Sequence, residues 1–276
     1  MFGTTFLCRF DECKGREIFL IVQVFVRFFL QKAGVFCNFV TMLDAALYLF
    51  PVGLSDAPLS TVLPQHNLEL LRQVKYFVVE NVRTARRFLK SVDRAIDINS
   101  LNFVELNEHT QPTDVPAMLA PLERGEAMGV LSEAGCPAVA DPGADLVAVA
   151  QRRGLKVVPL VGPSSILLAL MGSGFNGQSF AFMGYLPIDD ATRTRRLKEM
   201  QRRISSERQT QIFIETPYRN NKLIAELAAK LPGDMLLCVA SDITGPRQDI
   251  RTMPLHRWAK STYDYNKLPT IFLLYN

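Results

Sequence analysis

Short apolar runs alternate with amphipathic segments from residue 42 onward. In the first half of the chain, mostly apolar runs occupy residues 46–50, 76–79, 103–106, 128–131 and 156–160. Helical patterns lie between them at residues 83–92, 113–123 (with Thr113 and Asp114 as candidate N-caps) and 145–153. Because strands that are apolar throughout are typical of parallel sheets covered on both faces, this pattern predicts an α/β domain.

The second half of the chain shows the same alternation. Strands are predicted at residues 179–183, 211–214, 235–240, 249–253 and 270–275, with the last two as candidates for antiparallel pairing. Helices are predicted at residues 163–171, 191–203 and 220–231. We therefore expect two α/β domains with mostly parallel sheets, at residues 42–161 and 162–276. Ligands of such sheets bind at the carboxyl ends of the strands, which favours a site in the cleft between the domains.

The first 41 residues follow a different pattern. The run Ile18–Leu30 is apolar, but Gln23 and Arg27 interrupt it. It is also shorter than the roughly 20 residues that a membrane-spanning helix needs. Asp11 and Glu12 do not fit a signal peptide. We expect residues 1–41 to be an extension outside the folded core, and a helix on a membrane surface is the alternative.

Composition narrows the range of functions only slightly. The chain has 276 residues, is 48% hydrophobic and carries a formal net charge of +4, which is compatible with nucleic-acid binding without indicating it. Its five cysteines are an odd number and contain no C-x-x-C pair. This pattern predicts neither a disulfide framework nor a metal site, and favours a reduced, cytoplasmic setting.

Three loops of small residues follow predicted strands. They are Pro51-Val-Gly53, the longer stretch from Ser132 to Gly143, and Val161-Gly-Pro-Ser-Ser165. Small residues let the backbone approach a ligand, and a helix N-terminus adds N–H donors. Each loop alone could be an ordinary turn, but three at successive strand ends predict a binding site. Neither G-x-G-x-x-G nor a P-loop motif is present.

Four segments carry a family resemblance. They are "VLSEAGCPAVADPGADLV", "VVPLVGPSSILLALMGSGF", "FAFMGYLP" and "FIETPYR", in this order. Together they resemble the tetrapyrrole methylase superfamily, and within it the small-subunit ribosomal RNA 2′-O-ribose cytidine methyltransferases. The resemblance runs from about Leu47 to the C-terminus. It implies a methyltransferase that uses S-adenosylmethionine (SAM), binds it between two α/β domains and forms a homodimer.

The resemblance also implies which residues contact SAM. These cofactor residues are Pro51, Gly53, Ser132, Ala134, Gly135, Cys136, Val139, Ser164, Ser165 and Glu215. Cys136 stands where the family has threonine, and we expect a small buried thiol there rather than a nucleophile.

Three first-domain motifs depart from the family pattern. The family motif P-I-G-N-L corresponds to P-V-G-L-S at residues 51–55, which lacks the asparagine. The family motif A-E-D-T-R corresponds to V-E-N-V-R at residues 79–83, which keeps only Glu80 and Arg83. Residues 107–110 keep Glu108 and His109 of H-E-H-N. These motifs lie nearer the substrate in the family, so the sequence supports SAM binding more strongly than it supports a particular substrate.

A ribose hydroxyl is a weak nucleophile and gains from a nearby base. The candidate catalytic residues are Glu80, Glu108 and Glu215, and His109 could also act as a base. Each has a structural alternative: an ion pair between Glu80 and Arg83, a capping or surface role for His109, and backbone hydrogen bonds for Glu215.

RNA binding would require cations that contact phosphates. One predicted helix carries Arg83, Arg86, Arg87 and Lys90, and another carries Arg193, Arg195, Arg196, Lys198, Arg202 and Arg203. The predicted substrate-binding residues are Arg83, His109, Arg195, Arg196 and Arg219. The alternative for both helices is an ordinary solvated face.

The sequence therefore predicts a SAM-dependent methyltransferase that acts on the ribose of small-subunit ribosomal RNA. One alternative is a tetrapyrrole C-methyltransferase, although its glycine-rich first loop and G-D-P signature are missing. A second alternative is a protein that binds SAM or RNA without turnover, because the motifs at residues 79–83 and 107–110 are altered.

Overall fold

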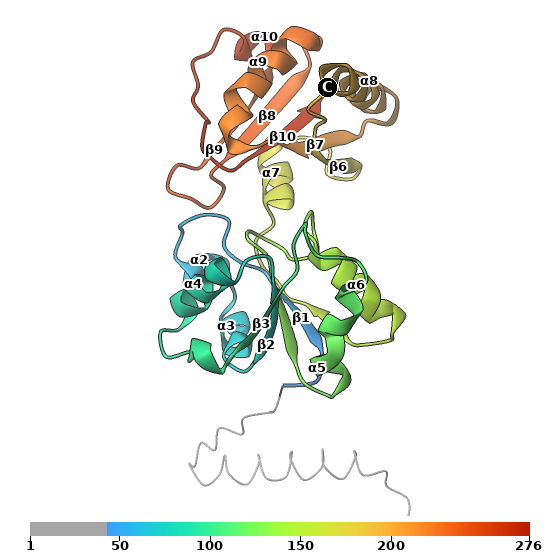
Figure 1. The fold of residues 1–276 in the computed structure, drawn as a ribbon. Coiled ribbons are helices and arrows are strands. Elements are labelled where there is room, and N and C mark those ends of the chain that lie inside the picture. Colours follow the sequence, from blue (N-terminus) through green and yellow to red (C-terminus); the bar gives the residue numbers. More distant parts are fainter. Residues whose placement is uncertain (1–42) are drawn as a thin grey trace, which may run out of the picture. The chain divides into compact units, whose positions relative to one another are not determined.

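The computed structural model describes residues 43–276 (Figure 1). The predicted extension at residues 1–41 lies outside these residues. Within the described part, no helix is both long enough and apolar enough to cross a membrane.

The first sheet has five parallel strands, as the apolar runs predict. They are β1 (Leu47–Phe50), β2 (Tyr76–Val79), β3 (Asn102–Glu105), β4 (Met128–Leu131) and β5 (Val157–Pro159), arranged in the order β3-β2-β4-β1-β5. Every residue of β1 and β4 is buried, which explains why these strands contain no polar positions. Because all five strands point the same way, the loops that follow them share one edge of the sheet.

Helices cover both faces of this sheet (Figure 1). On one face, Leu68 and Leu71 of α3 (Gln65–Leu71) and Leu89 of α4 (Val82–Val92) pack against Phe50 and Phe77. On the other face, α6 (Gly143–Arg152) and the short segments η2 (Val115–Leu119) and α5 (Ala120–Glu123) cover the sheet. Two further short elements are α2 (Leu59–Val62) and η1 (Ile98–Ser100).

The helix predicted at residues 113–123 is wrong in detail. The chain forms the 3₁₀ helix η2 and only one α-helical turn, α5, and the Asp114 side chain accepts no capping hydrogen bond. Pro116 and Pro121 explain the difference, because proline removes a backbone donor and is tolerated only in the first turn of a helix. The pattern did not predict the short helices α2 and α3, each of which directly follows a proline.

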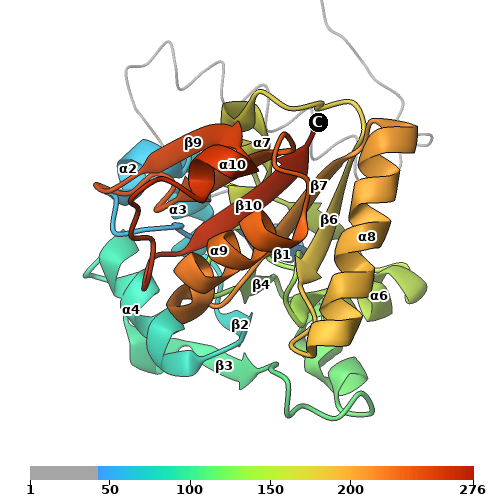
Figure 2. The same ribbon diagram turned by 90° about the horizontal axis from the view of Figure 1, so that it is seen from above.

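The second sheet is mixed (Figure 2). Its strands are β6 (Phe180–Tyr185), β7 (Thr210–Ile214), β8 (Leu236–Ser241), β9 (Asp249–Pro254) and β10 (Thr270–Tyr275), in the order β6-β7-β10-β8-β9. Only β6 and β7 are parallel, and the other three pairings are antiparallel. The prediction of a mostly parallel sheet is therefore correct for the first sheet and wrong for the second. The short connection at residues 242–248 explains the β8–β9 pairing, because a connection of this length can join antiparallel strands but not parallel ones.

Four helices cover the second sheet. Ala169 and Leu170 of α7 (Ser165–Ser173) pack against Ile212 and Leu273 on one face. The other face is covered by α8 (Asp190–Glu207), α9 (Asn220–Lys230) and α10 (Leu255–Trp258), whose apolar residues surround Phe213 and Phe272. The first sheet ends before residue 160 and the second begins at residue 180, but the exact domain boundary at residues 161–162 stays a prediction.

Candidate functional site

The three predicted small-residue loops meet at the carboxyl edge of the first sheet. The Val52 N–H donates to the Gly135 carbonyl at 2.9 Å, and the Cys136 thiol donates to the Pro163 carbonyl at 3.5 Å. A Cβ placed on Gly162 would lie 2.3 Å from Pro51 Cβ, so this approach of two loops requires glycine. Residues from the ends of β1, β4 and β5 therefore form one junction.

The long loop after β4 has an unusual backbone. Gly135, Ala138 and Ala140 all have positive φ, at 72°, 64° and 60°. This conformation is costly for alanine and persists only where the surroundings hold it. Asp141 Oδ1 holds it here by accepting hydrogen bonds of 2.8 Å from the Ala138 and Gly143 N–H groups. Strain of this kind is common at ligand sites, which makes the loop a candidate for ligand contact.

A fourth loop, which the sequence reasoning missed, joins the same junction from the second sheet. It follows β8 at residues 242–248, and Asp242 and Thr244 have φ of 48° and 70°. The Thr244 and Ser55 hydroxyls share a hydrogen bond of 3.0 Å. Leu54, which replaces the family asparagine, packs against the apolar cluster that contains Ile243. The only sequence signal for this loop is Gly245-Pro246.

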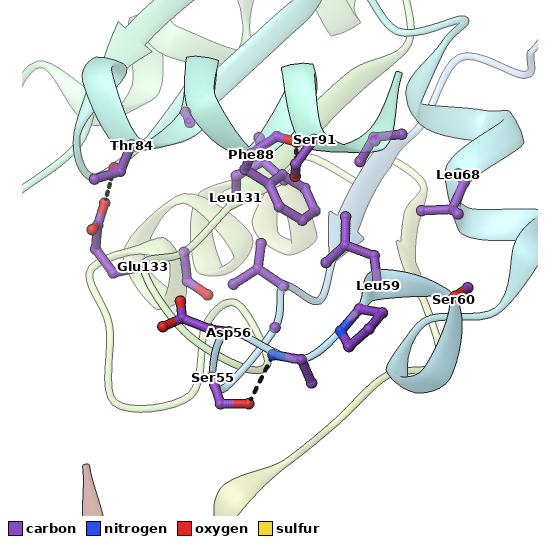
Figure 3. Close-up of a pocket in the computed structure, with 17 residues that line it drawn as sticks. Ser55, Asp56, Leu59, Ser60, Leu68, Thr84, Phe88, Ser91, Leu131 and Glu133 are labelled. Carbon is purple, nitrogen blue, oxygen red and sulfur yellow. Dashed lines mark hydrogen bonds between the residues drawn. The ribbon is translucent and has the colours of Figure 1, made fainter. Parts of the chain in front are cut away.

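A pocket of about 630 Å³ adjoins the junction (Figure 3). The loop after β1, helices α2, α3 and α4 and the start of the loop after β4 form its walls. Apolar side chains include Leu59, Leu68, Phe88 and Leu131, and polar ones include Ser55, Asp56, Thr84, Ser132 and Glu133. Within residues 43–276, no lysine or arginine lines it. The pocket thus suits an uncharged group of nucleoside size, since ligand pockets span about 300–1,000 Å³.

The remaining predicted cofactor residues lie on the same loops. Gly53 and Ser132 line the pocket, and the Ser132 hydroxyl donates to the Ala134 and Gly135 carbonyls at 3.4 and 3.5 Å. Ala134 and Val139 are exposed on the loop after β4. Ser164 caps α7 by accepting from the Leu167 N–H, and Ser165 is the first residue of that helix. Burial raises the pKa of the Cys136 thiol, in agreement with the expected small, unreactive thiol.

Glu80 lies in a group of acids directly after β2. Its carboxyl is half-buried, and burial together with the nearby Asp141 and Glu133 charges raises its pKa to about 7. Burial also raises the pKa of Asp141, whose Oδ2 has no partner within residues 43–276. Glu133 accepts a hydrogen bond from the Thr84 hydroxyl of α4 (Figure 3). The suggested ion pair between Glu80 and Arg83 does not form, and Glu133 and Asp141 are functional candidates that the sequence reasoning missed.

The other two candidate bases have different surroundings. Glu108 is exposed, with its Oε1 atom 3.6 Å from Nε2 of the equally exposed His109. Glu215 is buried, accepts a hydrogen bond of 2.8 Å from the Thr216 N–H and lies 3.6 Å from Arg219 Nη2. His109 thus lies at the surface and Glu215 accepts a backbone hydrogen bond, as their structural alternatives predict. The raised pKa of Glu80, about 7, suits a group that accepts a proton at neutral pH.

Helix α4 begins within the altered motif at residues 79–83 and has a side-chain N-cap. Asn81 replaces the family aspartate and still caps the helix, because its side-chain oxygen accepts from the Arg83 and Thr84 N–H groups at 2.8 and 3.2 Å. Arg83 and Arg87 are exposed and form no ion pair within the described chain. Arg86 lies over the Phe103 ring at 5.5 Å, and Lys90 donates to two backbone carbonyls.

Helix α8 differs from the predicted open basic face. Arg193 is buried, where it pairs with Glu226 at 2.8 Å and donates to the Pro187 and Ile188 carbonyls. Arg196 and Arg203 both pair with Glu199 at 3.0 Å. Only Arg195, Lys198 and Arg202 of the predicted group are exposed without an ion pair to another described residue. The prediction of six available cations is wrong, because Glu199 and Glu226 neutralise three of them.

No group of three histidine, cysteine, aspartate or glutamate residues that could hold a metal ion occurs between residues 43 and 276.

Comparison with known proteins identifies the family. A model of the Tetrapyrrole (Corrin/Porphyrin) Methylases matches residues 46–258. A Vibrio cholerae protein named ribosomal RNA small subunit methyltransferase I is 30% identical over 209 residues, covering 76% of this chain and 68% of the relative. A protein of the same name from Mesorhizobium japonicum is 32% identical over 221 residues, covering 79% of this chain and 70% of the relative.

Solved structures show the same fold at low sequence identity. The methyltransferase CobJ superposes with a TM-score of 0.57 at 16% identity, covering 84% of this chain and 94% of CobJ. A diphthine synthase superposes with a TM-score of 0.58 at 16% identity, covering 83% and 89%. The family match and the two relatives confirm what the sequence motifs predict: the chain belongs to the tetrapyrrole methylase family, whose members are methyltransferases that use S-adenosylmethionine.

Proposed function

We propose that this protein transfers a methyl group from SAM to a ribose 2′-hydroxyl of small-subunit ribosomal RNA. The observation that carries the proposal is the position of Glu80, a half-buried carboxyl with a pKa of about 7 at the edge where the small-residue loops meet. A ribose hydroxyl needs such a base. The choice of RNA rests on the two relatives named ribosomal RNA small subunit methyltransferase I.

The junction of loops fits SAM as its ligand. Gly162 and Gly135 let the loops pack closely against Pro51 and Leu54, which leaves backbone groups at the surface of the junction, and the N-terminus of α7 presents backbone N–H groups. SAM supplies a methyl group on a positively charged sulfonium. We propose that it is held by Pro51, Gly53, Ser132, Ala134, Gly135, Cys136, Val139, Ser164 and Ser165. Glu215, held in the second sheet by Thr216 and Arg219, is proposed to border the same site.

Glu80 is the proposed general base. Near neutral pH a large share of its carboxyl is ionised, and the ionised form accepts the proton that leaves the ribose hydroxyl as the oxygen–methyl bond forms. The bond between the methyl carbon and the sulfonium sulfur breaks in the same displacement, and the cofactor leaves as a neutral thioether. Burial is the main reason that its pKa lies near 7, and the negative charges of Asp141 and Glu133 add to it, because they disfavour ionisation of a third carboxyl. Proton transfer by a positioned base typically contributes about 10²–10⁴-fold to the rate.

The pocket beside the junction is proposed to hold the target nucleoside. Phe88, Leu59 and Leu131 offer apolar contacts to a base, and the Thr84 and Ser132 hydroxyls offer hydrogen bonds. The absence of a lining cation fits a group without phosphate. Phosphates would lie outside the pocket, where α4 exposes Arg83 and Arg87.

A homodimer is also proposed. Val161, Leu167 and Met171 are large apolar residues that are exposed on the loop after β5 and on α7. Exposed apolar side chains near one another often mark association sites. Action on ribosomal RNA further supports the proposed cytoplasmic location.

Two measurements on the full chain test the proposal. Calorimetry should first show SAM binding. Transfer of a labelled methyl group should then be measured with small-subunit ribosomal RNA that lacks the modification, and separately with a tetrapyrrole precursor. We expect label in the RNA alone. Label in the tetrapyrrole would establish the alternative reaction, and SAM binding without transfer to either would establish a protein without turnover on these substrates.

A further inference from the structure

Two tyrosines are exposed together at the carboxyl end of the parallel pair β6–β7, far along the chain from Glu80. Tyr185 ends β6 with 63% of its surface exposed, and Tyr218 follows β7 with 76% exposed. Tyr185 lies opposite Ile214, the last residue of β7, so both tyrosines belong to the same edge of the second sheet. Ile188, in the next loop, is 80% exposed. Neither tyrosine hydroxyl has a hydrogen-bond partner in the described structure.

The backbone accounts for the exposure of both rings. Gly184 has φ of 66°, and the register of β6 against β7 shifts between Phe182 and Tyr185. Irregularities of this kind redirect the next side chain. Tyr218 lies in the 3₁₀ turn η3 (Pro217–Arg219), which is held where the Lys267 N–H donates to the Pro217 carbonyl at 2.9 Å. The irregular end of β6 and the hydrogen-bonded turn η3 therefore hold the two rings at the surface.

Three cations lie on segments that adjoin the two tyrosines. Arg219 follows Tyr218 directly, and Lys267 is exposed beside Pro217. Arg195 lies near the start of α8, close to Asp189. The pKa of Asp189 is lowered mainly by its hydrogen bonds to Thr192, and the positive charge of Arg195 lowers it further.

The acids at this edge already have partners. Asp189 caps α8, and Asp190 binds Lys230. Glu215 is buried against Thr216 and Arg219, and Asp264 accepts from Asn221 and Asn266. Aromatic rings next to positive charge are the combination that binds unstacked nucleic-acid bases together with their phosphates.

We propose that Tyr185 and Tyr218 form a stacking platform for unpaired bases of the RNA substrate next to the methylated nucleotide. This inference rests on the proposed function, because it takes RNA as the substrate. Stacking on an aromatic side chain requires a base that is splayed out of a helix, since bases inside an A-form duplex are stacked on each other. The platform therefore selects single-stranded RNA over duplex RNA.

Binding of full-length protein to two fluorescent RNAs tests the platform. One is a single-stranded segment of small-subunit ribosomal RNA, and the other is the same segment paired with its complement. Tyr185→Ala and Tyr218→Ala should each weaken binding of the single strand by about 10-fold, whereas the Tyr→Phe variants should bind within about twofold of wild type. Duplex affinity should change little. Phe180→Ala is the matched control, because Phe180 is a partly exposed aromatic at the opposite end of β6.

Several results would overturn the platform. These are unchanged single-strand affinity in both alanine variants, an equal loss in the phenylalanine variants, or a loss of SAM affinity in place of RNA affinity. A fall in protein dimerisation at unchanged RNA affinity would assign the tyrosines to a protein contact instead. If wild type methylates RNA and the alanine variants bind it normally, only the platform fails. If wild type neither binds nor methylates RNA, the proposed function fails with it.

Discussion

The carboxyl edges of the two sheets differ in kind. The first-sheet edge, formed by the loops after β1, β4 and β5 with Glu80, consists of small residues, strained backbone and acids of raised pKa. The second-sheet edge, formed by Tyr185, Ile188 and residues 217–219, consists of exposed aromatic rings and cations. The first edge offers a proton acceptor next to the loops proposed to bind SAM, and the second offers aromatic rings on which RNA bases can stack. We infer that the first edge carries out methyl transfer and that the second contributes to RNA binding.

This division predicts different kinetic effects at the two edges. Changes to Glu80 and to the small-residue loops of the first-sheet edge should lower the rate of methyl transfer or SAM affinity, whereas changes in the neighbouring pocket, on the exposed face of α4 or at the second-sheet edge should weaken RNA binding alone. Four variants at the first sheet and its helices test this, in order of decreasing effect.

Glu80→Gln should have the largest effect. Glutamine keeps the shape of the side chain but cannot accept the proton, so the transfer rate should fall at least about 100-fold while SAM and RNA affinities stay near wild type. Because Glu80 must be ionised to act and its pKa is about 7, the wild-type rate should rise as the pH increases through about 7.

The test is the single-turnover rate of wild type and Glu80→Gln measured from about pH 5.5 to about pH 8.5. This range extends about 1.5 units on either side of a pKa near 7. Glu126→Gln, at an exposed turn before β4, is the control. A variant with normal activity, or an unchanged pH profile, would exclude Glu80 as the base.

Gly135→Val should have the next largest effect, which is loss of SAM binding. Gly135 has φ of 72°, and an added Cβ would lie 3.1 Å from Leu54 Cδ2 and 3.5 Å from the Pro163 carbonyl. Gly125→Val separates this crowding from backbone strain, because Gly125 has φ of 88° but no atom within 4 Å of an added Cβ. Both variants should be less stable than wild type by about 1–2 kcal/mol, and only Gly135→Val should lose SAM in calorimetry. Equal SAM affinity in the two variants would place the cofactor elsewhere.

Ala57→Phe should raise the KM for RNA by about 10-fold without changing SAM affinity. Ala57 lines the pocket proposed for the nucleoside, and a phenyl ring would occupy much of the space that a base needs. Ala148→Phe on the exposed face of α6 adds the same bulk away from the pocket. If Ala57→Phe lowers SAM affinity and leaves KM for RNA unchanged, the pocket belongs to the cofactor instead.

Removing two arginine charges from α4 or from α8 should have the smallest effect on RNA affinity, and the two helices should differ in this effect. Arg83→Gln with Arg87→Gln removes two exposed cations, and Arg196→Gln with Arg203→Gln removes two that already pair with Glu199. The first pair should lower the slope of log affinity against log salt by about 0.7 per lost contact with single-stranded RNA. The second pair should leave the slope unchanged. Equal changes would mean that pairing with Glu199 does not keep Arg196 from binding phosphate.

The sequence predicted the parts that depend on local pattern. The predicted segments match all ten strands, and in most of them an apolar run marks the buried positions, whereas β9 carries Asp249, Arg251 and Thr252. The meeting of the loops after β1, β4 and β5 followed from parallel strands sharing an edge. Glu80 and the small-residue loops were found by motif and position.

The rest depended on contacts between distant residues. The loop at residues 242–248 reaches Ser55 only because β8 and β9 are antiparallel, and no local pattern shows which way a strand runs. The burial of Arg193 requires Glu226 of another helix. The raised pKa of Glu80 comes from burial and from Asp141 and Glu133, more than 50 residues away in the chain.

The most direct test of the central claim is the position of the methyl group in the product. Small-subunit ribosomal RNA lacking the modification would be incubated with wild type and SAM, digested to nucleosides and analysed by mass spectrometry. We expect one nucleoside to gain a methyl group on its ribose, and this product to be nearly absent with Glu80→Gln. A methyl group on a base, or a ribose product that forms equally well with Glu80→Gln, would contradict methylation of a 2′-hydroxyl by a base at the first-sheet edge.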